Sequence, residues 1–118
     1  MRNDRLLLED IREAMDVILQ YTPAHRSAFD NDPPLQSHLL RHIQIIGEAA
    51  WRVSDDLKRC HPQVPWKRIA AMRHVLVHDY FRVDLDQVWN VVSVHVPVLQ
   101  PQIDAVLASL PPDDDQPQ

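Results

Sequence analysis

The densest group of chemically useful side chains lies between residues 73 and 80, where Arg73, His74, His78 and Tyr80 fall within eight residues. Arginine offers planar, bidentate donors to a phosphate and keeps its charge. Histidine can take or give a proton near neutral pH. Such a pair is suited to cleaving RNA without a metal, because the histidine can remove the 2′-hydroxyl proton while the arginine neutralises the charge that develops on the phosphorane.

The charges around this group favour an anionic ligand, although the whole chain is acidic. Twelve basic against 17 acidic residues give a net charge of −5, which argues against a protein that coats DNA. Residues 65–82, however, contain only one carboxylate, Asp79. The cations of this segment are Lys67, Arg68, Arg73 and Arg82. The sequence therefore predicts a local site for phosphate groups.

The spacing of the motif limits how its side chains can meet. On a regular helix, Arg73 and His78 lie about 140° apart and cannot share a face, whereas Arg73 and Tyr80 fall about 20° short of two full turns and could align. An Arg73–His78 site therefore needs the helix to end near His78, or a second copy of the chain that faces the first. The alternative is an ordinary surface turn, in which Arg73 pairs with a carboxylate, His78 caps carbonyl groups and Tyr80 is half-buried.

Histidines at i, i+4 spacing leave a metal site as a further alternative, since two imidazoles can then share one helix face. The pairs are His38/His42 and His74/His78, and Cys60-His61 could add ligands. The sequence has neither HExxH nor CxxC. Solvated or capping histidines, an inert cysteine and no bound metal are therefore expected.

Apolar residues at helical spacing predict the elements that position these side chains. A first stripe runs through residues 4–22 and ends at Pro23. Residues 24–31 are polar and are expected to form a loop. A second helix is expected from an N-cap at Asp32 to about Lys58.

The only glycine of the sequence, Gly47, falls inside this second helix. Glycine costs about 1 kcal/mol there against alanine, so it indicates close packing. Without further glycines the chain has no Gly-rich phosphate loop and no dinucleotide fingerprint. The tryptophans, which are Trp51, Trp66 and Trp89, are expected to be core or interface anchors rather than platforms for stacked bases.

The C-terminal half predicts further helices. A short third helix is expected within residues 65–72, opened by a proline. Asp84 is expected to cap a fourth, with Gln87 as its partner three residues on. The apolar stripe then continues, and Pro97 and Pro101 are expected to kink or split it, giving helices 84–95 and 97–109.

One stretch fits a strand as well as a helix. The residues from Val92 to Val98 alternate as in a strand, but Pro97 and the lack of a clear partner strand favour helix. The expected fold is all-α, a small antiparallel bundle of four to five helices over residues 1–110. Residues 111–118 are expected to be a disordered acidic tail.

Composition also bounds the compartment. A single cysteine rules out an internal disulfide and, with no signal peptide in the sequence, predicts a reducing cytoplasm. Uninterrupted apolar runs are only a few residues long, which predicts that no segment spans a bilayer.

Three blocks of the sequence resemble the HepT-like branch of the HEPN superfamily. They are Ile46-Gly47-Glu48-Ala49-Ala50, then Pro62-Gln63-Val64-Pro65-Trp66-Lys67-Arg68-Ile69-Ala70-Ala71-Met72-Arg73, then His78-Asp79-Tyr80-Phe81-Arg82-Val83-Asp84 with Val88-Trp89. The similarity runs from about residue 4 to 109. Its hallmark is an Arg, four residues, a His, one residue and a Tyr, which here are Arg73, His78 and Tyr80.

The resemblance implies an all-helical homodimer in which two Arg-x4-His motifs meet in a composite cleft. It also implies a metal-independent, cofactor-free endoribonuclease that acts as the toxin of a type II/VII-like toxin–antitoxin module. By this resemblance Arg73 and His78 are catalytic. A minimal nucleotidyltransferase antitoxin would transfer AMP from ATP to Tyr80, and the added phosphate and base would compete with RNA for Arg73.

The resemblance further implies which residues contact RNA. His74 occupies a position where the family often has Asn or Asp, and it is expected to contact the substrate. The other expected RNA-binding residues are Lys67, Arg68 and Arg82.

The alternative function is a non-catalytic helical dimer that pairs with a nucleotidyltransferase and binds nucleotide. That module would need Tyr80 alone, whereas this chain has the whole motif. A third possibility, a zinc-dependent hydrolase, predicts stoichiometric metal.

Overall fold

Helices make up most of the described chain. The computed structural model describes residues 3–74, 77–78 and 82–111, and for residues 77, 78 and 82 it describes the backbone. The elements are α1 (Asp4–Tyr21), α2 (Arg26–Asp30), α3 (Pro33–Arg52), α4 (Asp55–Cys60), α5 (Trp66–Ala71), β1 (Val77–His78), β2 (Arg82–Val83), α6 (Leu85–Asn90), the π-helical turn η1 (Val91–His95) and α7 (Val96–Ser109).

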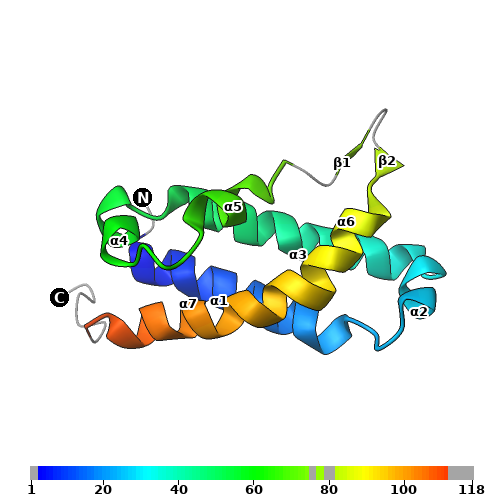
Figure 1. The fold of residues 1–118 in the computed structure, drawn as a ribbon, viewed down its shortest axis with the longest axis horizontal. Helices are drawn as coiled ribbons and strands as arrows, with labels where there is room; N and C mark the ends of the chain where they lie inside the picture. The colour runs from blue at the N-terminus through cyan, green and yellow to red at the C-terminus, as the bar shows by residue number, and fades with distance from the viewer. Residues whose placement is uncertain (1–2, 75–76, 79–81, 112–118) are drawn as a thin grey trace.

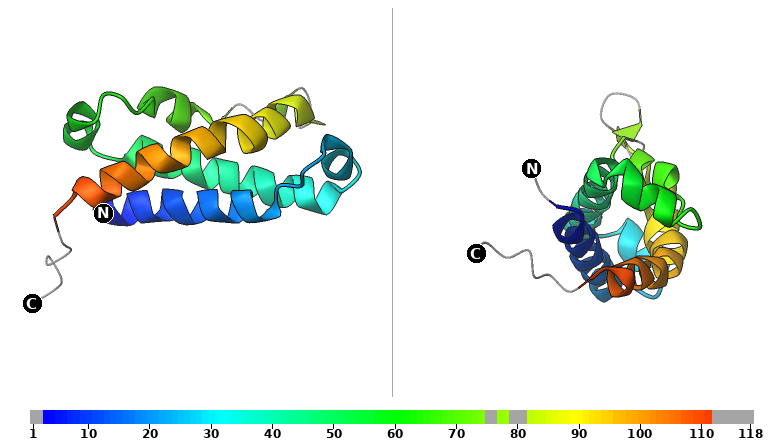
Figure 2. Two further views of the ribbon diagram at one scale, coloured as in Figure 1. Left: turned by 60° about the horizontal axis from the view of Figure 1, so that its bottom comes forward. Right: turned by 90° about the vertical axis from the view of Figure 1, so that its left-hand side faces the viewer.

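Three long helical rods form the bundle: α1, α3 and the continuous run α6–η1–α7 (Figure 1). α1 packs against both α3 and α7, and α5 packs against α3. The short helices α2 and α4 lie at opposite ends of the bundle (Figure 2). The predicted all-α class is confirmed, and β-structure in the described residues is limited to one antiparallel pair of two-residue strands.

The core of the described residues is apolar throughout. Its largest fully buried side chains are Phe29, Leu8, Ile11, Met15, Ile18, Leu39, Ile43, Ile46, Ile69, Ile103 and Val88. None of the buried residues in the described part is polar or charged. Except for Phe29, these side chains belong to the apolar stripes of the predicted helices, since helical spacing places them on one face.

Side-chain caps fix the helix starts that the sequence predicts. The carboxylate of Asp32 accepts a hydrogen bond from the Leu35 amide at 3.1 Å, and Pro33 follows as the first residue of α3. The carboxylate of Asp84 accepts one from the Gln87 amide, also at 3.1 Å. Both caps satisfy amides that have no partner within the helix.

Residues 26–30 form α2, so the prediction of a loop over residues 24–31 is wrong. The Phe29 side chain is fully buried, and its ring lies 5.4 Å from the Trp89 ring, centroid to centroid. Gln36 Nε2 donates to the Phe29 carbonyl at 2.9 Å. The buried Phe29 ring and its hydrogen-bonded carbonyl therefore hold α2 against the bundle. This helix is too short to show a hydrophobic period in the sequence.

The second predicted helix is also shorter than expected, because α3 ends at Arg52 and not near Lys58. Ser54 Oγ accepts a hydrogen bond from the Leu57 amide and starts α4. The carboxylate of Asp4 accepts from the Ser54 amide at 2.9 Å and from its hydroxyl at 2.6 Å, which ties this corner to the start of α1. The apolar spacing in the sequence continues past Ser54, but the Ser54 cap starts a separate helix there.

The valine-rich stretch is helical, as predicted, but the two prolines do not divide it. Residues 91–95 form the π-helical turn η1, in which the Val96 amide donates to the Val91 carbonyl. Pro97 follows the π-turn as the second residue of α7, inside the continuous helix Leu85–Ser109, and does not end it. Pro101 lies inside α7 without ending it.

The continuous helix Leu85–Ser109 is, by length and composition, the one described segment that could cross a membrane, with a mean hydropathy of 1.3 over 18 residues. The sequence prediction considered only uninterrupted apolar runs. In this helix polar residues interrupt the apolar sequence, so each such run is short. Seven of the helix's residues lie buried in the bundle core, namely Val88, Val91, Val92, Val96, Leu99, Ile103 and Val106. Core packing therefore accounts for the apolar face of this helix.

Candidate functional site

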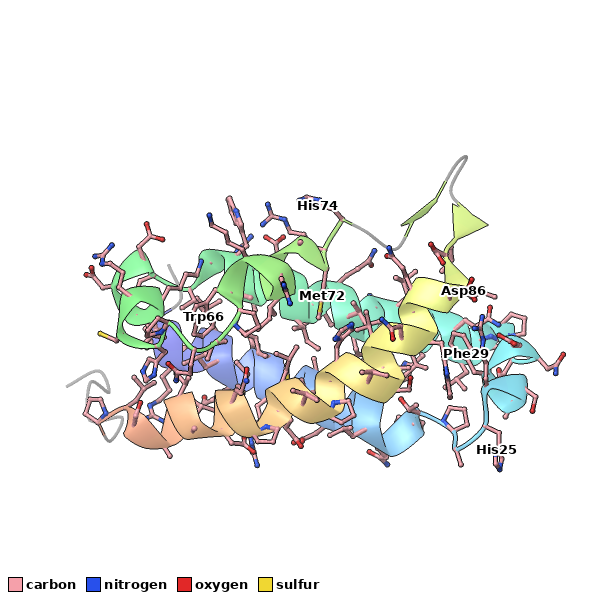
Figure 3. The ribbon with its side chains drawn as sticks, viewed as in Figure 1. His25, Phe29, Trp66, Met72, His74 and Asp86 are labelled. Atoms are coloured by element: carbon pink, nitrogen blue, oxygen red, sulfur yellow. The ribbon has the colours of Figure 1, made fainter. Side chains whose placement is uncertain are left out.

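Arg73 lies in the turn that follows α5. Its amide donates to the Ala70 carbonyl at 3.3 Å, and the His74 amide donates to the Ala71 carbonyl at 3.1 Å. Arg73 is half-buried, whereas His74 is exposed at the outer edge of the bundle beyond α5 (Figure 3). Arg73 is therefore the point at which the chain leaves the packed helices.

The guanidinium group of Arg73 rests on the indole of Trp51. Its Cζ lies 4.2 Å from the centre of the Trp51 ring system, a geometry in which the ring face attracts the cation. Trp51 keeps 56% of its surface exposed. Trp51 is therefore not a core anchor: it forms a surface shelf under Arg73, and the expectation that it anchors an interface stays a prediction.

His74 accepts a hydrogen bond from Arg73. The Arg73 Nε donates to His74 Nε2 at 2.9 Å, so Nε2 is the acceptor nitrogen of the ring in this contact. The Nη1 of Arg73 is buried and has no hydrogen-bond partner within the described residues. A buried guanidinium donor without an acceptor carries a desolvation cost, which a phosphate or carboxylate that displaces the groups covering it would relieve.

Gly47 lets α3 approach the backbone of Arg73. A Cβ atom at Gly47 would lie 2.4 Å from the Arg73 amide nitrogen and 3.0 Å from its Cβ, and real Cβ atoms essentially never come as close as the first distance. The close packing predicted for Gly47 is confirmed. Its neighbour is the turn that carries Arg73.

His78 does not continue the helix that precedes Arg73. It belongs to β1, opposite Arg82 of β2 in an antiparallel pair. Because α5 already ends at Ala71, the angles derived for a single regular helix do not apply to this motif. The side chains of His78 and Arg82, and all of Tyr80, lie outside the described part of the structure.

Cations of α4 and α5 gather around a hollow of about 600 Å³, which we call the basic groove. It is lined by Lys58, Arg59, Lys67 and Arg68, together with Asp55, Pro62, Val64, Pro65 and Trp66. Two of these cations, Lys67 and Arg68, are among the predicted RNA-binding residues. The sequence analysis did not single out Lys58 and Arg59. The signal that could have found them is the absence of any carboxylate from residue 57 to residue 74.

A second hollow of about 460 Å³, the π-turn groove, lies between α5 and the run α6–η1–α7. Its polar lining consists of Arg68, Gln87, Asn90, His95 and Gln102. Asn90 Nδ2 and His95 Nε2 lie 3.0 Å apart across the π-turn. Since Arg68 also lines the basic groove, the two hollows adjoin along α5.

The histidine pairs proposed for metal binding have other surroundings. His42 Nδ1 lies 2.8 Å from the His38 carbonyl oxygen, and the two rings meet edge to face at 4.6 Å. His74 follows the end of α5 and is not on a helix with His78, so these two do not share a helix face. Within the described residues there is no group of three or more His, Cys, Asp or Glu side chains that could hold a metal.

The other two tryptophans are anchors, as predicted. Trp66 is buried, its Nε1 donates to the His61 carbonyl at 3.0 Å, and it points into the bundle beside the α4–α5 connection (Figure 3). Trp89 packs on Phe29. Cys60, which the sequence predicts to be inert, is free and exposed.

Comparison with known proteins gives a consistent set of relatives. The chain matches the family described as "Ribonuclease HepT-like" over residues 11–106. It is 37% identical over 102 residues to a protein of Thermococcus cleftensis named "Probable ribonuclease HepT", covering 84% of this chain and 91% of the relative. A protein of Caldanaerobacter subterraneus, provisionally named an RNase, is 32% identical over 91% of this chain and 96% of its own length.

A further relative from Methanocaldococcus jannaschii, again provisionally named an RNase, is 32% identical over 94% of this chain and 93% of its own length. No solved structure matches the chain. The similarity to these relatives therefore extends over nearly the whole helical bundle.

Proposed function

The chain belongs to the HepT-like ribonuclease family, and we propose that it cleaves RNA without a metal, using Arg73 and His78 as catalytic residues. The observation that supports this most is the placement of Arg73. Its guanidinium is held by Trp51 and His74, and its Nη1 has no partner among the described residues. A phosphate oxygen would supply the missing acceptor.

The proposed reaction is an internal transesterification. His78 accepts the 2′-hydroxyl proton, the 2′-oxygen bonds to phosphorus, and the bond from phosphorus to the 5′-oxygen breaks. Arg73 neutralises the additional negative charge on the pentavalent phosphorus group. The leaving 5′-oxygen takes up a proton, and the other fragment ends in a 2′,3′-cyclic phosphate. His74, Lys67, Arg68 and Arg82 bind the RNA in this proposal.

The proposed active species is a homodimer. Arg73 lies in the turn after α5 and His78 stands in a two-residue strand, so the motif forms the connection from α5 to β1. A two-fold axis beside this connector would bring two copies of the motif into one cleft. Each cleft side would then hold an arginine clamp and a histidine base.

Regulation is proposed to act through Tyr80. A nucleotidyltransferase antitoxin would let the Tyr80 oxygen attack the α-phosphorus of ATP, forming a phenolic phosphoester and releasing pyrophosphate. The attached AMP places a negative phosphate beside Arg73 and competes with RNA for it. The protein would then be the toxin of a two-gene module in the cytoplasm, silenced by its neighbour.

The decisive experiment compares RNA cleavage by wild type and His78→Ala in the presence of EDTA. We expect His78→Ala to lose at least about 100-fold in rate, the usual contribution of a positioned base, and wild type to keep its rate in EDTA. Arg73→Lys should lose a comparable factor, because an ammonium cannot reproduce the bidentate fork. Equal cleavage by wild type and His78→Ala would overturn the proposal and favour a nucleotide-binding module.

A further inference from the structure

The basic groove concentrates positive charge at one corner of an acidic protein. Four cationic side chains from two helices line it, and Asp55 is its only carboxylate. From Lys58 to His74 the sequence contains no Asp or Glu, while the whole chain carries −5. An attractive potential for anions is therefore confined to this face.

The cations of the groove differ in how far the protein already satisfies them. Arg59 forms an ion pair with Asp56, one turn away in α4. Lys58 Nζ lies 3.4 Å from the Trp51 carbonyl oxygen. Lys67 and Arg68 have no ion-pair partner within the described residues. Lys67 and Arg68 therefore give the groove positive charge that no ion pair in the described residues neutralises.

The groove is connected to Arg73 on two sides. Arg68 lines both the basic groove and the π-turn groove, and the latter is also lined by Met72, the residue before Arg73. On the other side, Lys58 contacts the backbone of Trp51, whose ring carries the Arg73 guanidinium. Figure 3 labels Trp66 at the start of α5 and Met72 and His74 in the turn that follows it.

We infer that the basic groove binds the phosphates of a single-stranded RNA beyond the cleaved bond, with Lys58 and Arg59 as binding residues in addition to Lys67 and Arg68. The inference rests on the proposed ribonuclease function for its choice of ligand. A strand is favoured over an acidic protein, because Lys58 contacts the backbone of Trp51, whose ring carries the Arg73 guanidinium, so one strand could contact both places. Of the residues that line the hollow, Pro62 is exposed and Pro65 half-buried, so these two prolines offer apolar surface to sugars and bases.

The first test measures binding without cleavage. A fluorescent 20-nucleotide 2′-O-methyl oligoribonucleotide, which has no free 2′-hydroxyl to react, is titrated with wild type and with Lys58→Gln/Arg59→Gln at several salt concentrations. We expect roughly three- to tenfold weaker binding for the loss of two solvated ion pairs. The slope of log K against log salt should fall by about 1.4, or about 0.7 for each lost contact to a single strand.

The matched control removes two positive charges elsewhere. Arg41 is exposed and lines a different groove beside α1, and Arg12 is ion-paired with Asp104 as Arg59 is with Asp56. Arg41→Gln/Arg12→Gln should therefore bind the oligonucleotide within about twofold of wild type. Equal losses in both double variants would reduce the effect to net charge and overturn the groove as a site. Thermal unfolding of each variant checks that the bundle is intact.

The second test separates the groove from the catalytic step. A dinucleotide substrate does not reach beyond Arg73, so Lys58→Gln/Arg59→Gln should cleave it at the wild-type rate, while KM for a 20-nucleotide RNA rises. Unchanged binding and unchanged KM for the long RNA would refute the groove. A wild type that binds RNA in the groove but never cleaves it would refute the ribonuclease proposal alone. Loss of binding to an acidic protein partner, with RNA binding intact, would reassign the groove to that partner.

Discussion

Arg73 is held by contacts that fix its direction as well as its charge. The Trp51 ring supports the guanidinium from below, His74 accepts from Nε, and Gly47 allows the backbone of the turn to lie against α3. A surface arginine without such support would sample many rotamers, and ordering it on a phosphate would cost conformational entropy. The support therefore pre-organises the proposed clamp.

The indole of Trp51 is expected to contribute to activity without contributing to stability. A cation–π contact is worth about 0.5–2 kcal/mol, so Trp51→Leu should lower kcat/KM for RNA by about 2- to 30-fold. Trp51→Phe keeps an aromatic face and should retain most of the activity. Because Trp51 is largely exposed, both variants should unfold within a few degrees of wild type. Equal activity of the Leu variant and wild type would show that Arg73 needs no aromatic support.

Alanine at Gly47 is expected to damage the protein, although alanine favours a helix by about 1 kcal/mol. The added methyl group would overlap the Arg73 amide, and overpacking of this kind typically costs about 1–3 kcal/mol. We expect Gly47→Ala to unfold at lower urea concentration and to lose RNA cleavage by displacing the turn. A more stable and fully active Gly47→Ala protein would contradict the close approach.

The sequence singles out some residues of this site and not the contacts that hold them. Arg73 stands out through its residue type and spacing, and Gly47 through the cost of a glycine inside a helix. Trp51 does not stand out, because its position in the sequence does not show whether an indole faces the core or the surface. The available signal was its spacing, four residues after Gly47, which places both on one face of α3.

At the scale of the elements, the helix starts were predictable and several helix ends were not. A capping side chain acts within three residues, so Asp32 and Asp84 mark α3 and α6 directly in the sequence. The end of α3 depends on Ser54 and on its bonds to Asp4, fifty residues away. Tertiary contacts of this kind leave no local signature, and the same holds for α2, which is docked by Phe29.

The cap at Asp84 is expected to matter because it starts α6 immediately after β2. Asp84→Ala removes the acceptor for the Gln87 amide and should lower the free energy of unfolding by about 1 kcal/mol, whereas Asp84→Asn should cost only a few tenths. Urea unfolding followed by circular dichroism measures both. Equal destabilisation by Ala and Asn would indicate that the carboxylate charge, and not the cap, is the stabilising feature.

Ion pairs between the helical rods contribute less to the stability of the bundle than the apolar contacts do. Arg12 Nε donates to Asp104 at 2.6 Å and joins α1 to α7. This hydrogen bond, followed by the charge of Asp104 and of Asp16, raises the pKa of Arg12 above its ordinary value. Arg12 therefore stays charged at any pH at which the protein folds, and the pair adds little pH dependence. The apolar contacts between α1, α3 and α7 hold the bundle together.

For the whole molecule, periodicity predicted the bundle, but one chain alone does not complete the proposed site. The apolar stripes of α1, α3 and α7 face one core, which their spacing already indicated. The position of Arg73 and His78 relative to a second copy depends on surface residues. Their sequence has no period from which contacts between copies could be predicted. The resemblance to HepT-like proteins supplied that expectation.

The composite cleft predicts complementation between two inactive variants. Arg73→Lys and His78→Ala homodimers should both be inactive, whereas a mixed dimer contains one intact arginine and one intact histidine. Co-purified mixed dimers should therefore recover part of the RNA cleavage, and light scattering checks that each preparation is dimeric. A monomeric wild type, or mixed dimers as inactive as their parents, would exclude a site shared between copies.

The segment between Met72 and Asp84 joins two helices with contacts of their own: α5 packs against α3, and the carboxylate of Asp84 caps α6. The closure entropy of such a connector changes slowly with its length, by about 0.6 kcal/mol for a full doubling. Adding or removing one residue between Arg73 and His78 would hardly change the stability of the bundle. A change in that spacing that abolishes RNA cleavage would therefore act on the proposed site and not on the stability of the bundle.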